Sequence, residues 1–128
     1  MNAAAQHFRT KLAFETDAWD LNEMLRSGQN VVVIDARSAA AFADGHLPGA
    51  ISLPHRNMTE ETTRDLDREA LFVTYCDGIG CNASTKGALR MAELGFQVKE
   101  LIGGIDWWKR DGYPVETSAE ALVQPQVV

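Results

Sequence analysis

Residues 71–88 read LFVTYCDGIGCNASTKGA, and this stretch decides the architecture expected for the chain. Residues 71–75 form a nearly continuous apolar run, which is typical of a strand covered on both faces of a parallel sheet. A loop with two glycines follows, and the next helix is expected to begin near Asn82 to Ser84, because either residue can act as its N-cap. A strand followed by a loop and a helix is the building unit of an α/β domain.

The same alternation continues on both sides of this stretch. Residues 31–35 (VVVID) predict a second covered strand, and the stripe of Trp19, Leu21, Met24 and Leu25 predicts a helix that stops at Gly28. Further strands are predicted at 12–16, at 50–53 and within 98–104, where a glycine turn ends the strand. Further helices are predicted at 38–45, as a short helix within 58–69, after the cysteine loop, and at 105–112. The pattern therefore predicts an α/β fold with a mostly parallel central sheet and helices on both faces.

Length and charge narrow the function classes. The 128 residues fit one compact domain. The division expected is an N-terminal arm (1–11), a folded domain (12–116) and a C-terminal tail (117–128) without a strong period. A net charge of −6 argues against nucleic acid or an anionic membrane as the main partner. No apolar run has the length of a membrane span, and the first residues lack a leader-like apolar segment, so a cytoplasmic location is predicted.

Both cysteines of the chain, Cys76 and Cys81, lie in the quoted loop. In a reducing cytoplasm, reactive or redox chemistry is a better interpretation of such a pair than a structural disulfide. Cys76 directly follows the strand at 71–75, so it is placed at the carboxyl edge of the sheet, where α/β folds bind their ligands.

The loop after Cys76 has the composition of an anion cradle. The glycines in Asp77, Gly78, Ile79 and Gly80 allow backbone amides to turn inward, and the start of the next helix adds its dipole. This environment favours a thiolate or a bound oxyanion and would make Cys76 a nucleophile. The simpler interpretation is a buried, inert cysteine before an ordinary turn.

Cys81 has two open interpretations. Its thiol could reach Cys76 across the short loop and attack a persulfide or sulfenic acid there, closing a disulfide as a resolving thiol. It could instead point into the core as a small apolar side chain. A metal site is not predicted, because two cysteines lack the second pair of ligands that a closed zinc site needs.

Two longer segments, 31–54 and 94–116, resemble the rhodanese-like domain family. The residues that carry the resemblance are Asp35, Arg37, Phe42, Gly45, His46, Pro48, Gly49, Ala50, Gly103, Gly104, Trp107, Gly112, Pro114 and Val115. The resemblance implies a doubly wound α/β domain with Cys76 as the catalytic cysteine. It also implies sulfur transfer without a cofactor: Cys76 takes sulfane sulfur from a donor such as thiosulfate or a persulfide, and passes it to a thiol acceptor.

The loop departs from the pattern of the sulfurtransferases in this family. They close a shorter loop with an arginine just before the serine of the next helix, and alignment places Ala83 on the arginine and Ser84 on the serine. Without that arginine, phosphatase chemistry on an oxyanion is not expected. Asp77 should also raise the pKa of Cys76 and repel thiosulfate, unless His55, Arg56 or Lys86 offsets its charge.

Three residues near the site are interpreted as structural. Asp35 and Arg37 are expected to form an ion pair at a strand end, and His46 is expected to lock a turn with Pro48 and Gly49. Asn82 and Ser84 are expected to orient the loop and cap the helix. The function predicted is a sulfurtransferase working through a Cys76 persulfide. The alternative is a non-catalytic binding or redox-sensing module that uses the Cys76/Cys81 loop.

Overall fold

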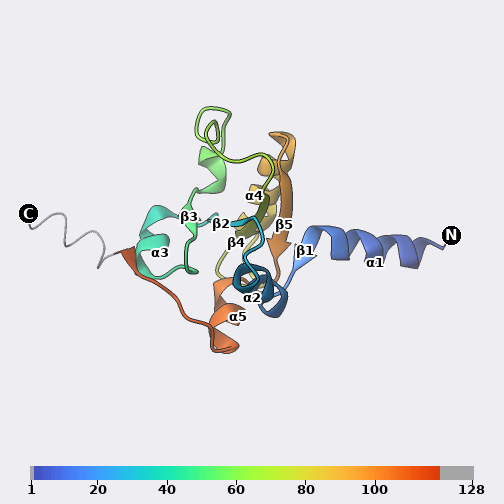
Figure 1. Ribbon diagram of the computed structural model, residues 1–128, viewed down its shortest axis with the longest axis horizontal. Helices are drawn as coiled ribbons and strands as arrows, with labels where there is room; N and C mark the ends of the chain where they lie inside the picture. The colour runs from blue at the N-terminus through green and yellow to red at the C-terminus, as the bar shows by residue number, and fades with distance from the viewer. Residues whose placement is uncertain (1, 119–128) are drawn as a thin grey trace, which may run out of the picture.

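A computed structural model describes residues 2–118 of the chain, and its centre is a five-stranded parallel sheet in the order β1-β5-β4-β2-β3 (Figure 1). The two predicted apolar runs form the neighbouring strands β2 and β4, which pair along their whole length. The strands are β1 (Glu15–Thr16), β2 (Val31–Asp35), β3 (Ile51–Ser52), β4 (Leu71–Tyr75) and β5 (Gln97–Leu101).

Helices cover both faces of this sheet, as predicted. On one face, Val33 and Val73 pack with Leu21 of α2 and with Trp108 of α5. On the other face, Phe72 packs with Met91 of α4. The helices are α1 (Ala3–Phe14), α2 (Ala18–Arg26), α3 (Ala39–Asp44), α4 (Ala83–Glu93), α5 (Gly104–Arg110) and a 3-10 turn, η1 (His55–Asn57).

The strand predicted at 12–16 is wrong for most of its length. Residues Ala3–Phe14 form helix α1, and only Glu15–Thr16 pair with β5. Asn2 caps the helix by accepting a hydrogen bond from the backbone N–H of Ala5, and an alanine-rich first turn favours helix. No residue of α1 is buried, and the helix extends away from the sheet (Figure 1).

The helix predicted at 58–69 is also wrong, because this segment forms successive turns. Threonine hydroxyls compete here for the backbone groups that a helix would use. Thr59 Oγ1 accepts a hydrogen bond from the backbone N–H of Thr62, and the hydroxyl of Thr62 donates to the Asn57 carbonyl.

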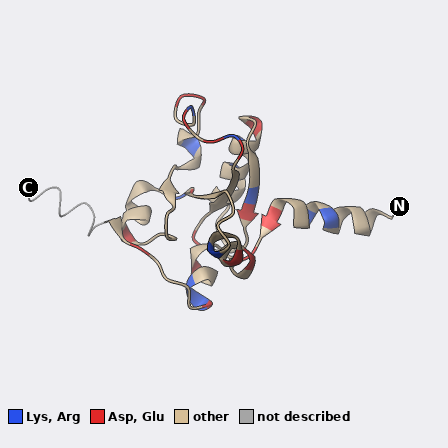
Figure 2. Ribbon diagram, in the orientation of Figure 1, with Lys and Arg blue, Asp and Glu red and all other residues tan. Residues whose placement is uncertain are grey.

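Charged residues of both signs are distributed over most elements of the molecule (Figure 2). Among residues 2–118, no helix is long and apolar enough to cross a membrane.

Candidate active site

Cys76 lies where the sequence places it, directly after the last residue of β4. It is buried, with 1% of its surface exposed. The first turn of α5 fixes the backbone on either side: the N–H of Ile105 donates to the Cys76 carbonyl at 3.0 Å, and the N–H of Asp106 donates to the Asp77 carbonyl at 2.9 Å. The cysteine is therefore anchored between β4, which precedes it, and α5, which follows it.

Cys76 and Cys81 are joined by a disulfide across the loop, with their Cα atoms 6.2 Å apart. The loop is folded back by a turn in which the N–H of Cys81 donates to the Gly78 carbonyl at 3.2 Å. Of the two open interpretations of Cys81, the one in which it points into the core away from Cys76 is wrong. The two sulfur atoms meet, and Cys81 is half-buried beside the loop.

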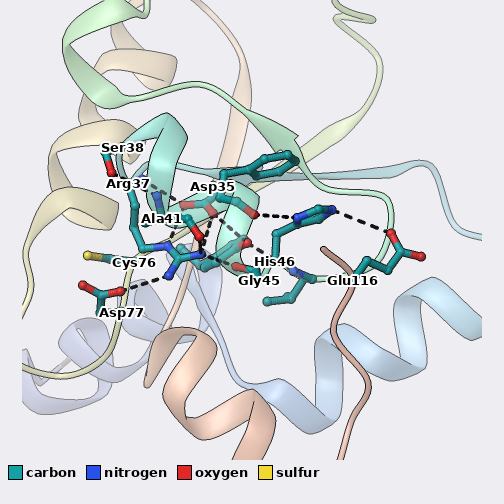
Figure 3. Close-up of polar contacts among 12 residues, drawn as sticks. Asp35, Arg37, Ser38, Ala41, Gly45, His46, Cys76, Asp77 and Glu116 are labelled. Atoms are coloured by element: carbon teal, nitrogen blue, oxygen red, sulfur yellow. Dashed lines mark hydrogen bonds and ion pairs between the residues drawn. The ribbon is translucent and has the colours of Figure 1, made fainter. Parts of the chain in front are cut away.

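The expected ion pair between Asp35 and Arg37 is present, and it reaches the cysteine loop (Figure 3). Asp35 is fully buried and accepts hydrogen bonds from the Arg37 guanidinium at 2.7 and 3.0 Å. The same guanidinium donates to Asp77 Oδ1 at 3.0 Å. Burial lowers the pKa of Arg37, but Asp35 and Asp77 outweigh that effect and hold it above its usual value. Arg37 thus stays charged and offsets the carboxylate next to Cys76.

Tyr75 is a site residue that the sequence reasoning missed. Its hydroxyl donates to Asp35 Oδ2 at 3.0 Å and accepts from the N–H of Leu47 at 3.2 Å. Burial, followed by the charge of Asp35, raises the pKa of Tyr75 above its ordinary value. The signal in the sequence is a tyrosine at the last position of an otherwise apolar strand, where a hydroxyl needs a partner.

The start of α4 is held differently from the expectation. Asn82 occupies the N-cap position, but its side chain makes no capping hydrogen bond. Ser84 does not cap the helix either, because its hydroxyl donates to Glu100 of β5 at 2.7 Å. Thr85 donates to the same carboxylate oxygen at 2.7 Å. Glu100, which the sequence reasoning also missed, therefore ties the helix that follows the cysteine loop to the sheet.

His46 has the structural position expected of it. Its Nδ1 lies 2.8 Å from the Phe42 carbonyl, and its ring stacks on the Phe42 ring. Its backbone pairs with that of Glu116 in an isolated bridge. These contacts connect the turn after α3 to the C-terminal segment of the domain (Figure 3).

An open cleft of about 560 Å³ lies over the disulfide. Its lining includes Cys76, Cys81, Asp77 and Ala83. Arg37 and the residues of η1 line it as well, which brings His55 and Arg56 into the cleft. Desolvation, together with the charges of Lys86, Arg56 and Arg90, lowers the pKa of His55. Of the basic residues considered from the sequence, His55 and Arg56 thus line the cleft, and the lowered pKa disfavours the charged form of His55.

The other residues of the predicted loop face a second open cleft, of about 640 Å³, next to β5. Cys81 borders this cleft as well, so it is the residue that the two clefts share. The predicted loop residues are therefore not gathered around one cavity. Those in the second cleft are Gly78, Ile79, Gly80, Asn82 and Ser84.

One group of potential metal ligands occurs in the described part of the chain, Cys76, Asp77 and Cys81, with ligand atoms within 4.8 Å of one another. Both sulfurs are shared in the disulfide, and the thiolate is the form of cysteine that binds metals. Asp77 is engaged by Arg37. In this state the group is not a metal site.

Comparison with known proteins assigns the family. A family model described as Rhodanese-like domain matches residues 17–111. The chain belongs to the rhodanese-like domain family. The match covers strands β2 to β5, helices α2 to α5 and the cysteine loop.

Named relatives and a solved structure resemble the chain over most of its length. A "Thiosulfate sulfurtransferase GlpE" from Actinobacillus succinogenes is 33% identical over 79% of this chain and 86% of its own. The BH2092 protein from Bacillus halodurans has a crystal structure that matches with a TM-score of 0.86 at 43% identity, covering 90% of this chain and 85% of that one. An "HTH-type transcriptional regulator Rv0324" from Mycobacterium tuberculosis is 34% identical over 80% of this chain. The matched region spans 46% of that relative's length.

Proposed function

We propose that this rhodanese-like domain is a sulfurtransferase with Cys76 as its nucleophile. The Cys76 thiolate attacks the outer sulfur of thiosulfate, the S–S bond of the donor breaks, and sulfite leaves. The sulfur stays on Cys76 as a persulfide until a thiol acceptor takes it. Relatives named thiosulfate sulfurtransferases, similar over most of the chain, support this reaction class.

The observation that carries the proposal is that Cys76 lines a cleft that the guanidinium-bearing residues Arg37 and Arg56 also line. Arg37, His55 and Arg56 line the same cleft as the cysteine. Thiosulfate carries two negative charges, and guanidinium groups are well suited to oxyanions. Arg37 is engaged by Asp35 and Asp77, so Arg56 is the residue that gives this cleft a cation for a dianionic donor.

Arg56 supplies a substitute for the missing loop arginine. Ala83, the position at which the sequence resemblance leads one to expect arginine, borders the same cleft as Arg56. A guanidinium from η1 can therefore contact a donor bound in this cleft. This arrangement supports the enzyme over a non-catalytic module.

Asp77 opposes the donor less than its sequence position suggests. The Arg37 guanidinium lies 3.0 Å from its carboxylate and offsets the charge beside Cys76. Sulfane transfer between two sulfur atoms needs no electron carrier, so the reaction proposed uses no cofactor. A cytoplasmic location and the absence of a nucleic-acid partner stay predictions.

The test is sulfur loading measured by intact-protein mass spectrometry. Fully reduced Cys81→Ser protein is mixed with thiosulfate. In this variant Cys81 cannot remove sulfur from the Cys76 persulfide by closing a disulfide. We expect the gain of one sulfur atom, its removal by cyanide, and no gain in a Cys76→Ser variant. Arg56→Gln, added to the Cys81→Ser protein, should slow loading about tenfold, because a charge-assisted contact to the donor is lost.

The matched control for the charge change is Arg26→Gln in the same Cys81→Ser protein. Arg26 is 74% exposed at the end of α2, remote from the cleft. Arg26→Gln removes the same unit of charge as Arg56→Gln, but the variant should load sulfur at the unaltered rate. If Cys81→Ser gains no sulfur from thiosulfate, the proposed reaction is wrong.

A further inference from the structure

We propose that Cys81 is a second catalytic thiol, which discharges the Cys76 persulfide as hydrosulfide and leaves the disulfide seen in the structure. The inference rests on the proposed function and adds an activity to it. The domain would then release reduced sulfur and need a dithiol to restore it, instead of only handing sulfane sulfur to an acceptor.

The disulfide itself shows that the Cys81 sulfur can reach Cys76. The backbone that carries Cys76 is fixed by β4 on one side and by the first turn of α5 on the other. The loop returns through the turn between Gly78 and Cys81, so both thiols are presented to each other by a short, closed segment. A persulfide on Cys76 is therefore formed within reach of an internal thiol.

The step balances without an external oxidant. The Cys81 thiolate attacks the Sγ atom of Cys76, a bond forms between the two cysteine sulfurs, and the bond from Sγ to the outer sulfur breaks. The outer sulfur takes both electrons of that bond and the proton that Cys81 has released, and it leaves as hydrosulfide. The sulfane sulfur is reduced and the two cysteines are oxidised to a disulfide.

The surroundings favour departure of an anion. A persulfide on Cys76 would lie at the cleft that Arg56 also lines, so the leaving hydrosulfide would meet the positive charge of that residue. Cys81 lies at the border of that cleft and of the second one. The attacking thiol and the leaving sulfur can therefore occupy different sides of Cys76.

Regeneration is expected to occur at Cys81. Cys76 is only 1% exposed, whereas Cys81 is half-buried and borders both clefts. A dithiol reductant attacks the Cys81 sulfur, Cys76 leaves as a thiolate, and the second thiol of the reductant closes its own disulfide. The product is the reduced domain, ready for another donor molecule.

The test is a single turnover of fully reduced protein with thiosulfate, in the absence of any other thiol. Hydrosulfide is measured by a colorimetric assay, and the protein is weighed intact after alkylation. We expect wild type to release one equivalent of hydrosulfide and to lose two hydrogen atoms. Neither of its cysteines should then be alkylated, because both are in the disulfide. Cys81→Ser should release none and keep one added sulfur atom. Addition of dithiothreitol should make wild type turn over repeatedly.

A variant with its second thiol at another position tests whether hydrosulfide release depends on the position of that thiol or only on the number of thiols. Cys81→Ser combined with Ser27→Cys keeps two cysteines, but residue 27 ends α2 at the edge of the sheet where β2 begins, opposite to the cysteine loop. It should hold the persulfide like Cys81→Ser. Prompt hydrosulfide release from this variant would overturn the proposed role of Cys81.

Failure of this inference differs from failure of the proposed function. If Cys81→Ser gains sulfur but wild type also keeps a stable persulfide and releases no hydrosulfide, Cys81 is not a resolving thiol and sulfur transfer stands. If Cys81→Ser gains no sulfur at all, sulfur transfer is wrong and the resolving role is excluded with it.

Discussion

At the scale of single residues, Tyr75 joins the fold to the site. It is fully buried, and its hydroxyl connects the Asp35 carboxylate to the backbone of Leu47. Tyr75→Phe leaves the Leu47 N–H without this acceptor and Asp35 without this donor. We expect a loss of about 1–3 kcal/mol in the free energy of unfolding at pH 7, measured by urea denaturation.

The same variant tests the titration of Tyr75. Its pKa is raised in the folded protein, so the folded state holds this proton more tightly than the unfolded state does. The stability that the hydroxyl contributes is complete below the ordinary tyrosine pKa of about 10 and falls as the pH rises above it. The stability difference between wild type and Tyr75→Phe should therefore shrink in alkaline solution. Tyr113→Phe, at the other tyrosine of the chain, is the control. An unchanged difference up to pH 11 would contradict the argument.

Asp77 offers a direct test of the charge balance beside Cys76. Its side chain is 71% exposed, so losing its ion pair with Arg37 in Asp77→Asn should cost less than about 1 kcal/mol. Removing the carboxylate should nevertheless favour the Cys76 thiolate. We expect the pH profile of Cys76 alkylation, measured in reduced Cys81→Ser protein, to move to lower pH by about one unit.

The control for this shift is Asp106→Asn in the same protein. Asp106 also lies beside the loop, but its carboxylate contacts Arg110 and its side chain is 59% exposed. It should leave the profile nearly unchanged. If Asp77→Asn does so too, solvent screens the exposed Asp77 carboxylate from Cys76.

Residues of the site were predictable where their contacts are local. The pair of Asp35 and Arg37 is separated by two positions, and Cys76 follows its strand directly, so both could be placed from the sequence. The Tyr75 hydroxyl meets Asp35 from 40 positions away, and Ser84 meets Glu100 from 16 positions away. Such partners depend on strand order, which alternation of strands and helices alone does not specify.

At the scale of elements, continuous apolar segments of the sequence predicted strands correctly, whereas polar segments did not predict secondary structure. The strands at 31–35 and 71–75 are where they were expected, because burial on both faces leaves a continuous apolar signal. The polar segment 58–69 lacked such a signal, and threonine hydroxyls decided its conformation. Helix α1 was missed because none of its residues is buried, so it shows little apolar periodicity.

The contact between α5 and the cysteine loop depends on Gly104. Its φ is +58°, and an added Cβ would overlap the Cys76 carbonyl and lie 2.8 Å from the N atom of Gly78. Gly104→Ala should therefore destabilise the fold by more than the roughly 1–2 kcal/mol of a left-handed alanine alone. It should also slow closure of the disulfide, because the loop must move.

Gly112→Ala is the matched control for this prediction. Gly112 has a φ of +85°, but an added Cβ would meet nothing within 4 Å. It carries the conformational cost without the collision. Thermal unfolding and the rate of disulfide closure, followed by mass spectrometry, separate the conformational cost from the effect of the collision. Equal effects in both variants would show that the contact with Cys76 is unimportant.

At the scale of the whole molecule, the cysteine loop couples the chemistry of the site to the stability of the domain. The loop connects β4, which lies in the centre of the sheet, to α4, which covers one face. Glu100 and α5 hold the two ends of this connection from outside the loop. The folded domain can therefore present both thiols whether or not they are bonded, and the main effect of the bond falls on the unfolded chain.

This reasoning predicts how the redox state changes global stability. The disulfide closes a loop with a sequence separation of 5, and restricting so short a segment of the unfolded chain is worth about 2 kcal/mol. The free energy of unfolding, measured by urea denaturation, should be higher by this amount for oxidised than for reduced wild type. For Cys81→Ser it should be the same with and without reductant. If reduction instead lowered the free energy of unfolding by much more and made the amides of α4 exchange rapidly, the disulfide would be required for the native structure of the site. The turnover proposed for Cys81 would then need a conformational change at every cycle.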